Sequence, residues 1–207
     1  DLPLTVQIRE VLLHATVASH REGPKAALPQ IAFAGRSNVG KSTLLNAFFG
    51  RPLAATSKHP GKTRTINYYL VNGTVYFVDL PGYGYAQVAK SERAGWGRRV
   101  TDYVVGEERL RLVVALVDPR IPTSPLDRNL LDLLRGCGRT FLVVMTKSDC
   151  LGRGALAAAA QRLQRDLALA EEPLPVSART GMNTKKLLAQ LAAVASGARR
   201  VSEEGVA

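Results

Sequence analysis

A run of eight residues matches G-x-x-x-x-G-K-[ST], a pattern that binds nucleotide phosphates. It reads Gly35, Arg36, Ser37, Asn38, Val39, Gly40, Lys41 and Ser42. The glycines allow backbone N–H groups to wrap around phosphates, and a helix that follows adds the positive end of its dipole. We expect Lys41 to contact the β- and γ-phosphates and the Ser42 hydroxyl to ligate Mg²⁺. The sequence therefore predicts a nucleoside triphosphate site.

A second motif closes a predicted strand and consists of Asp79, Leu80, Pro81 and Gly82. Asp79 would then lie at the Mg²⁺ edge of the site, and the N–H of Gly82 could sense the γ-phosphate. D-x-x-G alone is common, and an aspartate that merely ends a strand is the alternative. The place of the motif after the phosphate loop favours the nucleotide interpretation.

The base is indicated by a third motif, formed by Thr146, Lys147, Ser148 and Asp149. A carboxylate there can accept hydrogen bonds from guanine N1–H and from the exocyclic N2, a pair that adenine does not offer. Further along, Val176, Ser177 and Ala178 end the last predicted strand and fit a backbone contact to guanine O6. The order of these motifs predicts GTP and GDP as ligands rather than ATP.

The loop between the first two motifs contains Gly61, Lys62, Thr63, Arg64 and Thr65. Its hydroxyls could complete the Mg²⁺ shell when γ-phosphate is present. We choose Thr63 over Thr65, because the β-branched Thr65 could simply begin a strand. The candidate metal ligands are thus Ser42 and Thr63, with Asp79 helping to organise the metal, and the candidate catalytic residues are Lys41, Thr63 and Gly82. No general base is evident.

Several apolar or β-branched runs predict the strands that must position these motifs, at residues 29–35, 65–71, 74–80, 111–118, 140–146 and 174–177. Asn72 and Gly73 form a hairpin signal between the second and third runs. Helical patterns occupy residues 42–49, 126–134 and 156–169. This order predicts an α/β P-loop GTPase domain with a six-stranded, mostly parallel sheet, one antiparallel edge strand and helices on both faces. Ligands of such sheets bind at the carboxyl ends of the strands.

One domain fits the length of 207 residues. We expect a short N-terminal helix and connector over residues 1–28, the GTP-binding domain over 29–200, and a flexible tail over 201–207. The apolar runs are far shorter than a membrane span, and the features of a secretory signal are missing, so we expect a cytoplasmic protein. Cys137 and Cys150 have no spacing that indicates a disulfide framework or zinc.

The formal net charge is +11, from 28 basic and 17 acidic residues. Such charge suits a polyanionic partner, although a basic surface that only keeps the protein in solution is the alternative. Clustering favours a partner, since residues 51–64 hold four basic and no acidic residues and residues 179–200 hold five basic and none acidic. The predicted basic face includes Lys58, Lys62, Arg64, Lys185 and Lys186.

With these motifs in order, the chain resembles the EngB family (also YihA or YsxC) of bacterial GTPases, of the TrmE-Era-like class, which assist large ribosomal subunit assembly. The resemblance covers most of the chain and is carried by IAFAGRSNVGKSTLLNAF, HPGKTRT, DLPGYGYA followed by Trp96, and LVDPRIPTSPLD. It implies guanine nucleotide and Mg²⁺ binding at the matched positions. It also implies slow GTP hydrolysis and a partner in ribosomal RNA or the precursor of the large subunit.

Two positions depart from familiar patterns. Cys150 stands where the family usually has Lys, and Tyr83 stands where many GTPases place a water-orienting Gln. Asn38 occupies a position that ligates K⁺ in related GTPases, so the resemblance implies help from K⁺, although Asn38 could instead only hydrogen-bond its own loop. The alternatives to an assembly GTPase are a GTP/GDP sensor whose hydrolysis is not essential and a signalling GTPase linked to cell division and septation. We expect a monomer.

Overall fold

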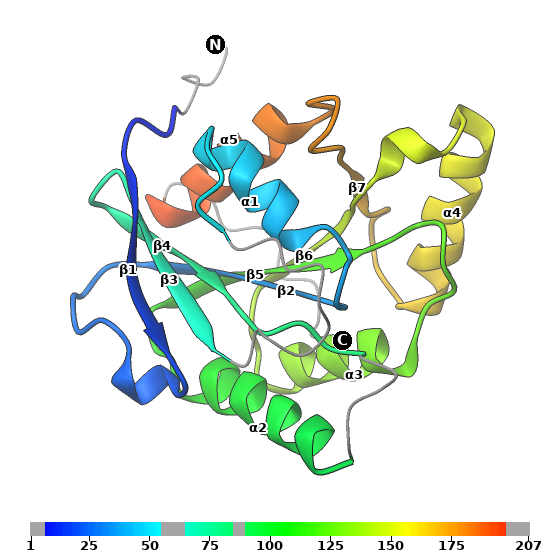
Figure 1. The fold of residues 1–207 in the computed structure, drawn as a ribbon. Coiled ribbons are helices and arrows are strands. Elements are labelled where there is room, and N and C mark those ends of the chain that lie inside the picture. The colour runs from blue at the N-terminus through cyan, green and yellow to red at the C-terminus, as the bar shows by residue number, and fades with distance from the viewer. Residues whose placement is uncertain (1–6, 55–64, 85–89, 198–207) are drawn as a thin grey trace.

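A seven-stranded sheet organises the computed structural model, which describes residues 7–54, 65–84 and 90–197, with only the backbone for 90–96. The strand order is β1-β3-β4-β2-β5-β6-β7 (Figure 1). The strands are β1 Val11–Val17, β2 Gln30–Gly35, β3 Ile66–Val71, β4 Val75–Asp79, β5 Leu110–Val117, β6 Phe141–Met145 and β7 Leu174–Pro175. The helices are α1 Lys41–Phe49, α2 Lys90–Gly106, α3 Pro125–Gly136, α4 Arg153–Asp166 and α5 Thr184–Ala195, with 3₁₀ turns at His20–Glu22 and Ser148–Cys150. These elements confirm the predicted α/β architecture.

Helices cover both faces of the sheet, and two hydrophobic clusters lie between them and the strands. Helices α2 and α3 lie against one face and α1 and α5 against the other (Figure 1). Because successive strand residues point to opposite faces, Ile31 and Phe33 of β2 pack in the α1/α5 cluster, whereas Ala32 and Ala34 pack in the cluster of α2, α3 and α4. The central strands are therefore buried on both sides, which explains their continuous apolar runs.

The N-terminal segment corrects the expectation of a helix within residues 1–28. Residues Val11–Val17 instead form β1, which pairs antiparallel with β3, from Val11 opposite Val71 to Val17 opposite Ile66. The segment is rich in the β-branched and apolar residues that favour strands, and β3 offers it an unpaired edge. The sheet consequently has seven strands instead of six, and its edge strand β1 pairs antiparallel with β3.

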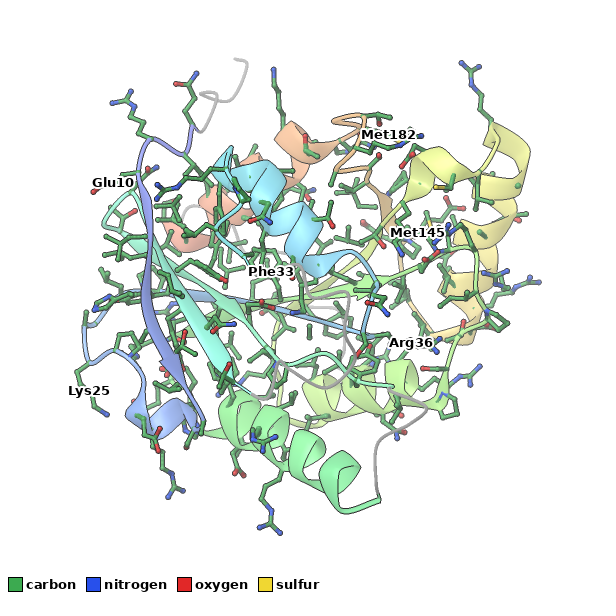
Figure 2. The ribbon with its side chains drawn as sticks, in the orientation of Figure 1. Glu10, Lys25, Phe33, Arg36, Met145 and Met182 are labelled. Atoms are coloured by element: carbon green, nitrogen blue, oxygen red, sulfur yellow. The ribbon has the colours of Figure 1, made fainter. Side chains whose placement is uncertain are left out.

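The parallel strands end on a common side of the molecule. Arg36, just beyond β2, and Met145, the last residue of β6, lie on one side in Figure 2, and Glu10 and Lys25 lie on the opposite side. Each of the three nucleotide motifs follows a strand that ends on this side, namely β2, β4 and β6. The sheet thus brings together residues that are more than 100 positions apart in the chain, as for Thr146 and Val39.

No helix among the described residues is both long enough and apolar enough to cross a membrane.

Candidate nucleotide-binding site

The phosphate loop connects β2 to α1 and has the backbone geometry that its glycines and Asn38 permit. Gly40, the N-cap of α1, has φ 105°, and Asn38 has φ 63°, both in the left-handed region. A Cβ on Gly35 would come within 2.9 Å of the Leu116 carbonyl oxygen and of Val39 Cγ1, so the loop can leave the sheet only through a glycine. No side chain caps α1, which leaves its first N–H groups available to an anion.

Lys41 and Asp79 form a buried ion pair at the centre of the site. Their side chains come from the first turn of α1 and the end of β4, and are 9% and 4% exposed. Burial lowers the pKa of the Lys41 ammonium to about 7, whereas the Asp79 carboxylate beside it favours the charged form. A nucleotide phosphate bound at Lys41 would replace Asp79 as its anionic partner and would release that carboxylate toward a metal.

The D-x-x-G turn packs directly on the phosphate loop. The Tyr83 carbonyl accepts a hydrogen bond from Ser37 N–H at 2.7 Å, and the Tyr83 N–H donates to the Gly35 carbonyl at 3.3 Å. A Cβ on Gly82 would lie 3.1 Å from Ser37 Oγ, which shows how closely the two segments approach. The predicted γ-phosphate sensor is therefore adjacent to the predicted phosphate cradle.

The guanine motif holds the phosphate loop from its other side. Thr146 Oγ1 donates to the Val39 carbonyl at 2.6 Å, and Lys147 Nζ donates to the Asn38 carbonyl at 2.6 Å. Lys147 Nζ also lies 3.2 Å from Asp118 Oδ2, at the end of β5. The hydrogen bonds and charge of Arg120 and Lys147 outweigh the effect of burial and lower the pKa of the Asp118 carboxyl to about 2.

A cavity of about 240 Å³ lies beside these motifs. It is lined by Gly40, Thr43, Leu44, Thr146, Lys147, Asp149, Cys150, Val176, Ala178 and Arg179. Asp149 Oδ2 accepts hydrogen bonds from Arg179 Nε at 2.8 Å and Nη2 at 2.6 Å. The Ser177 hydroxyl and the Arg179 guanidinium hold the pKa of the Asp149 carboxyl below its usual range. A charged carboxylate at the wall of a mostly apolar cavity can receive the N1–H and N2 donors of a guanine ring.

The residues that would hold Mg²⁺ offer oxygen ligands, which this hard cation prefers. Ser42 is half-buried in the first turn of α1, and Asp79 ends β4 beside Lys41. The described residues contain no group of three or more His, Cys, Asp or Glu that could bind a metal by themselves. Mg²⁺ in phosphate-transfer sites keeps several waters and binds substrate phosphates, so Ser42 and Asp79 could form part of its shell.

Several predicted site residues fall outside the described ranges. These are Gly61, Lys62, Thr63 and Arg64 of the loop before β3, and Lys58 of the basic face. Thr65 lies immediately before β3, which begins at Ile66, in line with its alternative interpretation as a strand-initiating residue. The remaining predicted residues lie in the phosphate loop, in the D-x-x-G turn, or around the guanine motif and the strand end at Val176.

Three residues of the site were not predicted from the sequence. Asp118 bonds Lys147, Arg179 bonds Asp149, and Asp127 accepts the Tyr83 hydroxyl at 2.7 Å. Asp118 follows an apolar strand just as Asp79 does, and this position at a strand's carboxyl end was an available signal. Asp127 lies three residues after Ser124, the spacing of a helix capping box. The pairing of Arg179 with Asp149 had no local signal.

Comparison with protein families identifies relatives across most of the chain. The family model described as 50S ribosome-binding GTPase matches residues 30–147. Three proteins named "Probable GTP-binding protein EngB" match more widely. That of Chlorobaculum parvum is 47% identical over 169 residues, covering 81% of this chain and 88% of the relative. The Chlorobium phaeobacteroides protein is 43% identical over 188 residues (90% and 98%), and that of Kosmotoga olearia 44% over 183 residues (87% and 96%).

Solved structures share the fold. The crystal structure of a probable GTP-binding protein engB aligns with a TM-score of 0.70 at 23% identity, over 81% of this chain and 99% of that one. Era in complex with MgGDPNP and nucleotides 1506–1542 of 16S ribosomal RNA aligns with a TM-score of 0.63 at 20% identity, over 79% of this chain and 55% of that one. The phosphate loop, the D-x-x-G turn and the guanine motif thus occur in a P-loop GTPase fold. The chain belongs to the EngB family of GTP-binding proteins, and it is a GTPase.

Proposed function

We propose that this GTPase hydrolyses GTP slowly with Mg²⁺ and uses its two nucleotide states as a switch in assembly of the large ribosomal subunit. The observation that carries the proposal is the convergence of Lys41, Gly82 and the guanine pocket at one edge of the sheet, where a γ-phosphate can be sensed. The family description, 50S ribosome-binding GTPase, supports the choice of partner. The nucleotide site would act as the switch, and its two states would differ in their binding to the ribosome.

In the proposed reaction, water attacks the γ-phosphorus, the bond to the β–γ bridging oxygen breaks, and GDP and phosphate leave. Lys41 and the N–H groups at the start of α1 would stabilise the charge on the phosphates. Ser42, Thr63 and Asp79 would hold Mg²⁺, which neutralises developing charge on the phosphate oxygens. Tyr83 has no side-chain amide to orient the attacking water, and its hydroxyl is already donated to Asp127. Both features support a slow intrinsic rate.

A basic face would carry the contact with ribosomal RNA. Lys185 and Lys186 are exposed in the first turn of α5, and Lys58, Lys62 and Arg64 would extend the face from the loop before β3. Because that loop contains Thr63, the γ-phosphate could order it and so control the contact. Phosphate contacts give affinity without sequence specificity. Selectivity would therefore come from shape and from ribosomal proteins.

Co-sedimentation with ribosomal subunits tests this proposal. We expect association with the large subunit or its precursor when a non-hydrolysable GTP analogue is bound, weaker association with GDP, and a fall in affinity as salt rises. The variants Lys185→Ala and Lys186→Ala should each reduce the slope of log affinity against log salt by about one. Lys25→Ala is the matched control, since Lys25 is also exposed but lies on the opposite side of the molecule (Figure 2).

Equal association with GTP analogue, GDP and no nucleotide would refute the proposal that nucleotide state controls the basic face. An affinity that does not depend on salt would refute it as well. Single-turnover kinetics with and without subunits separate a switch from a sensor, because a sensor needs no stimulation of hydrolysis. Failure to bind subunits in any state would favour signalling linked to cell division and septation.

The proposal further includes a cytoplasmic monomer and assistance from K⁺ at Asn38, whose side chain makes no hydrogen bond to the described residues.

A further inference from the structure

Tyr83 occupies the position at which many GTPases orient water, yet its side chain is turned into the protein. The residue is 3% exposed, and its ring belongs to the hydrophobic cluster beneath α2 and α3. The hydroxyl donates to Asp127 Oδ1 at 2.7 Å. Burial, and then the charge of Asp127, raise the pKa of Tyr83 well above its ordinary value, so the hydroxyl remains a donor at neutral pH.

Asp127 is itself held rigidly. Its other carboxylate oxygen, Oδ2, accepts the Ser124 N–H at 2.8 Å and the Ser124 hydroxyl at 2.9 Å. These contacts form the capping box that begins α3, and Pro125 follows at its first position. Both oxygens of a buried carboxylate are therefore engaged, one by the helix cap and one by Tyr83. A tyrosine bonded here is fixed relative to α3.

The backbone of Tyr83 is fixed to the other partner, the phosphate loop. Tyr83 and Arg36 form a parallel β-bridge, made by the hydrogen bonds to Ser37 and Gly35. Gly84 has φ 83°, and a Cβ there would lie 3.4 Å from Arg36 Nε, so the chain turns away directly after Tyr83. One residue therefore joins the phosphate loop, through its backbone, to the start of α3, through its side chain.

We propose that Tyr83 is a positioning residue for GTP hydrolysis, whose hydroxyl bond to Asp127 holds the Gly82 N–H against the phosphate loop. Gly82 precedes Tyr83 and already lies close to Ser37. A small rotation of the Tyr83 backbone would move the Gly82 N–H, and a misplacement of about 1 Å can cost a large factor in rate. The inference rests on the proposed role of Gly82 as the γ-phosphate sensor. It does not depend on the ribosomal partner.

The alternative is that Tyr83 only fills the core. The two roles differ in what they predict for the nucleotides. A packing role affects GTP and GDP alike, because both need a folded site. A positioning role acts through the Tyr83 hydroxyl and Gly82, so it affects chiefly the γ-phosphate. The backbone bonds of Tyr83 to Ser37 and Gly35, and the contacts of Lys147 and Asp149, do not use that hydroxyl.

The test uses the full chain with the substitution Tyr83→Phe, which keeps the ring and removes the hydroxyl. We expect the ratio of affinity for a non-hydrolysable GTP analogue to affinity for GDP to fall about tenfold, the effect of one buried hydrogen bond to a charged acceptor. The kcat should fall by a similar factor, and GDP affinity should stay within about twofold. Fluorescent-nucleotide titration and single-turnover hydrolysis provide these measurements.

Two matched control variants accompany Tyr83→Phe. Tyr103→Phe removes the hydroxyl of another fully buried tyrosine in the same cluster, which donates to Gln30 Oε1 at 2.8 Å. Ser124→Ala removes the hydroxyl bond of the capping box but keeps the Ser124 N–H bond to Asp127 Oδ2 and the Tyr83 bond, so Asp127 stays in place. Both should lower the free energy of unfolding and leave the nucleotide ratio unchanged. Asp127→Ala should reproduce the effect of Tyr83→Phe, and the double variant should lower the ratio no further than Asp127→Ala alone.

An unchanged ratio and kcat in Tyr83→Phe would overturn the inference and leave only packing. An equal change in the ratio in Tyr103→Phe or Ser124→Ala would also overturn the inference. If Tyr83→Phe fails to fold, the ratio measured with Asp127→Ala decides. Loss of GDP and GTP binding together would refute the positioning role, because the guanine and β-phosphate contacts should survive. Such a result would not bear on ribosome binding, which is measured separately.

Discussion

The structure predicts that the substitution Asp118→Asn affects both the stability of the fold and the nucleotide site. The Asp118 side chain is only 5% exposed and pairs with both Arg120 and Lys147. Lys147 in turn donates to the Asn38 carbonyl in the phosphate loop and lines the guanine cavity. Replacing the carboxylate by an amide of the same shape removes one negative charge between two cations. Both the stability of the fold and the position of Lys147 should suffer.

The pKa of Asp118 sets the size of the effect. Its value is about 2, against an ordinary value of 3.8. Each pKa unit corresponds to about 1.36 kcal/mol, so the interactions contribute at most roughly 2.5 kcal/mol. The Arg120 side chain is 41% exposed, and solvent screens its share. We therefore expect the free energy of unfolding at pH 7 to fall by about 1 to 2 kcal/mol, with a melting temperature lower by about 5 °C.

The sign of the pH dependence follows from the lowered pKa. The stabilisation is complete above the ordinary value of 3.8 and is lost as the pH falls toward 2, where the folded carboxyl gains its proton. The variant and the parent protein should thus differ at pH 7 and approach each other as the pH is lowered below 4. Urea unfolding at several pH values measures the difference. Release of a fluorescent GDP analogue should also become faster in the variant.

Asp132→Asn is the matched control, because Asp132 pairs with Arg135 at 3.4 Å but is 70% exposed. That substitution should change the free energy of unfolding by less than about 0.5 kcal/mol and should not affect nucleotide release. The reasoning would be wrong if both variants behaved alike. A difference between parent and Asp118→Asn that grew on acidification would contradict it as well.

Three further predictions concern the nucleotide directly. Asp149→Asn should weaken GTP binding at least about 100-fold, since two hydrogen bonds to a charged acceptor are disturbed, and should improve binding of xanthosine triphosphate; unchanged affinities in titration would remove the guanine assignment. Lys41→Met should abolish turnover and cost about 3 kcal/mol of stability by leaving the buried Asp79 carboxylate unpaired. The double variant Lys41→Met/Asp79→Asn should regain the stability but not the turnover, and a collapsed circular dichroism spectrum in both variants would contradict this. Hydrolysis should be faster in K⁺ than in Na⁺ at fixed ionic strength, and equal rates would exclude a role for Asn38 in binding K⁺.

The sequence was sufficient for features that depend on local pattern. The phosphate loop was predictable because Gly35, Gly40 and Lys41 perform tasks that few other residue types can perform at that spacing. The strands were predictable because runs such as residues 112–117 are buried on both faces and so are apolar throughout. The order of the motifs along an alternating chain then implied a common edge of the sheet, since parallel strands end on the same side.

The N-terminal segment shows where local pattern was insufficient. Residues Val11–Val17 contain neighbouring apolar side chains, which are compatible with either a helix or a strand. The choice was made by β3, whose exposed edge needed hydrogen-bond partners, although the paired residues lie 49 to 60 positions apart in the chain. Pairing between distant segments overrides intrinsic preference, because it satisfies a whole row of backbone donors and acceptors together.

The sequence alone therefore determined which residue types bind the nucleotide. The tertiary structure decided which other residues hold those side chains in place. Nothing in the spacing of Tyr83 and Asp127, or of Asp118 and Lys147, indicates that each pair shares a hydrogen bond or ion pair. Those contacts exist because packing excludes water around the ends of β5 and α3, and a buried polar group must then find a partner in the protein. Which partner it finds depends on the folded arrangement of the whole sheet.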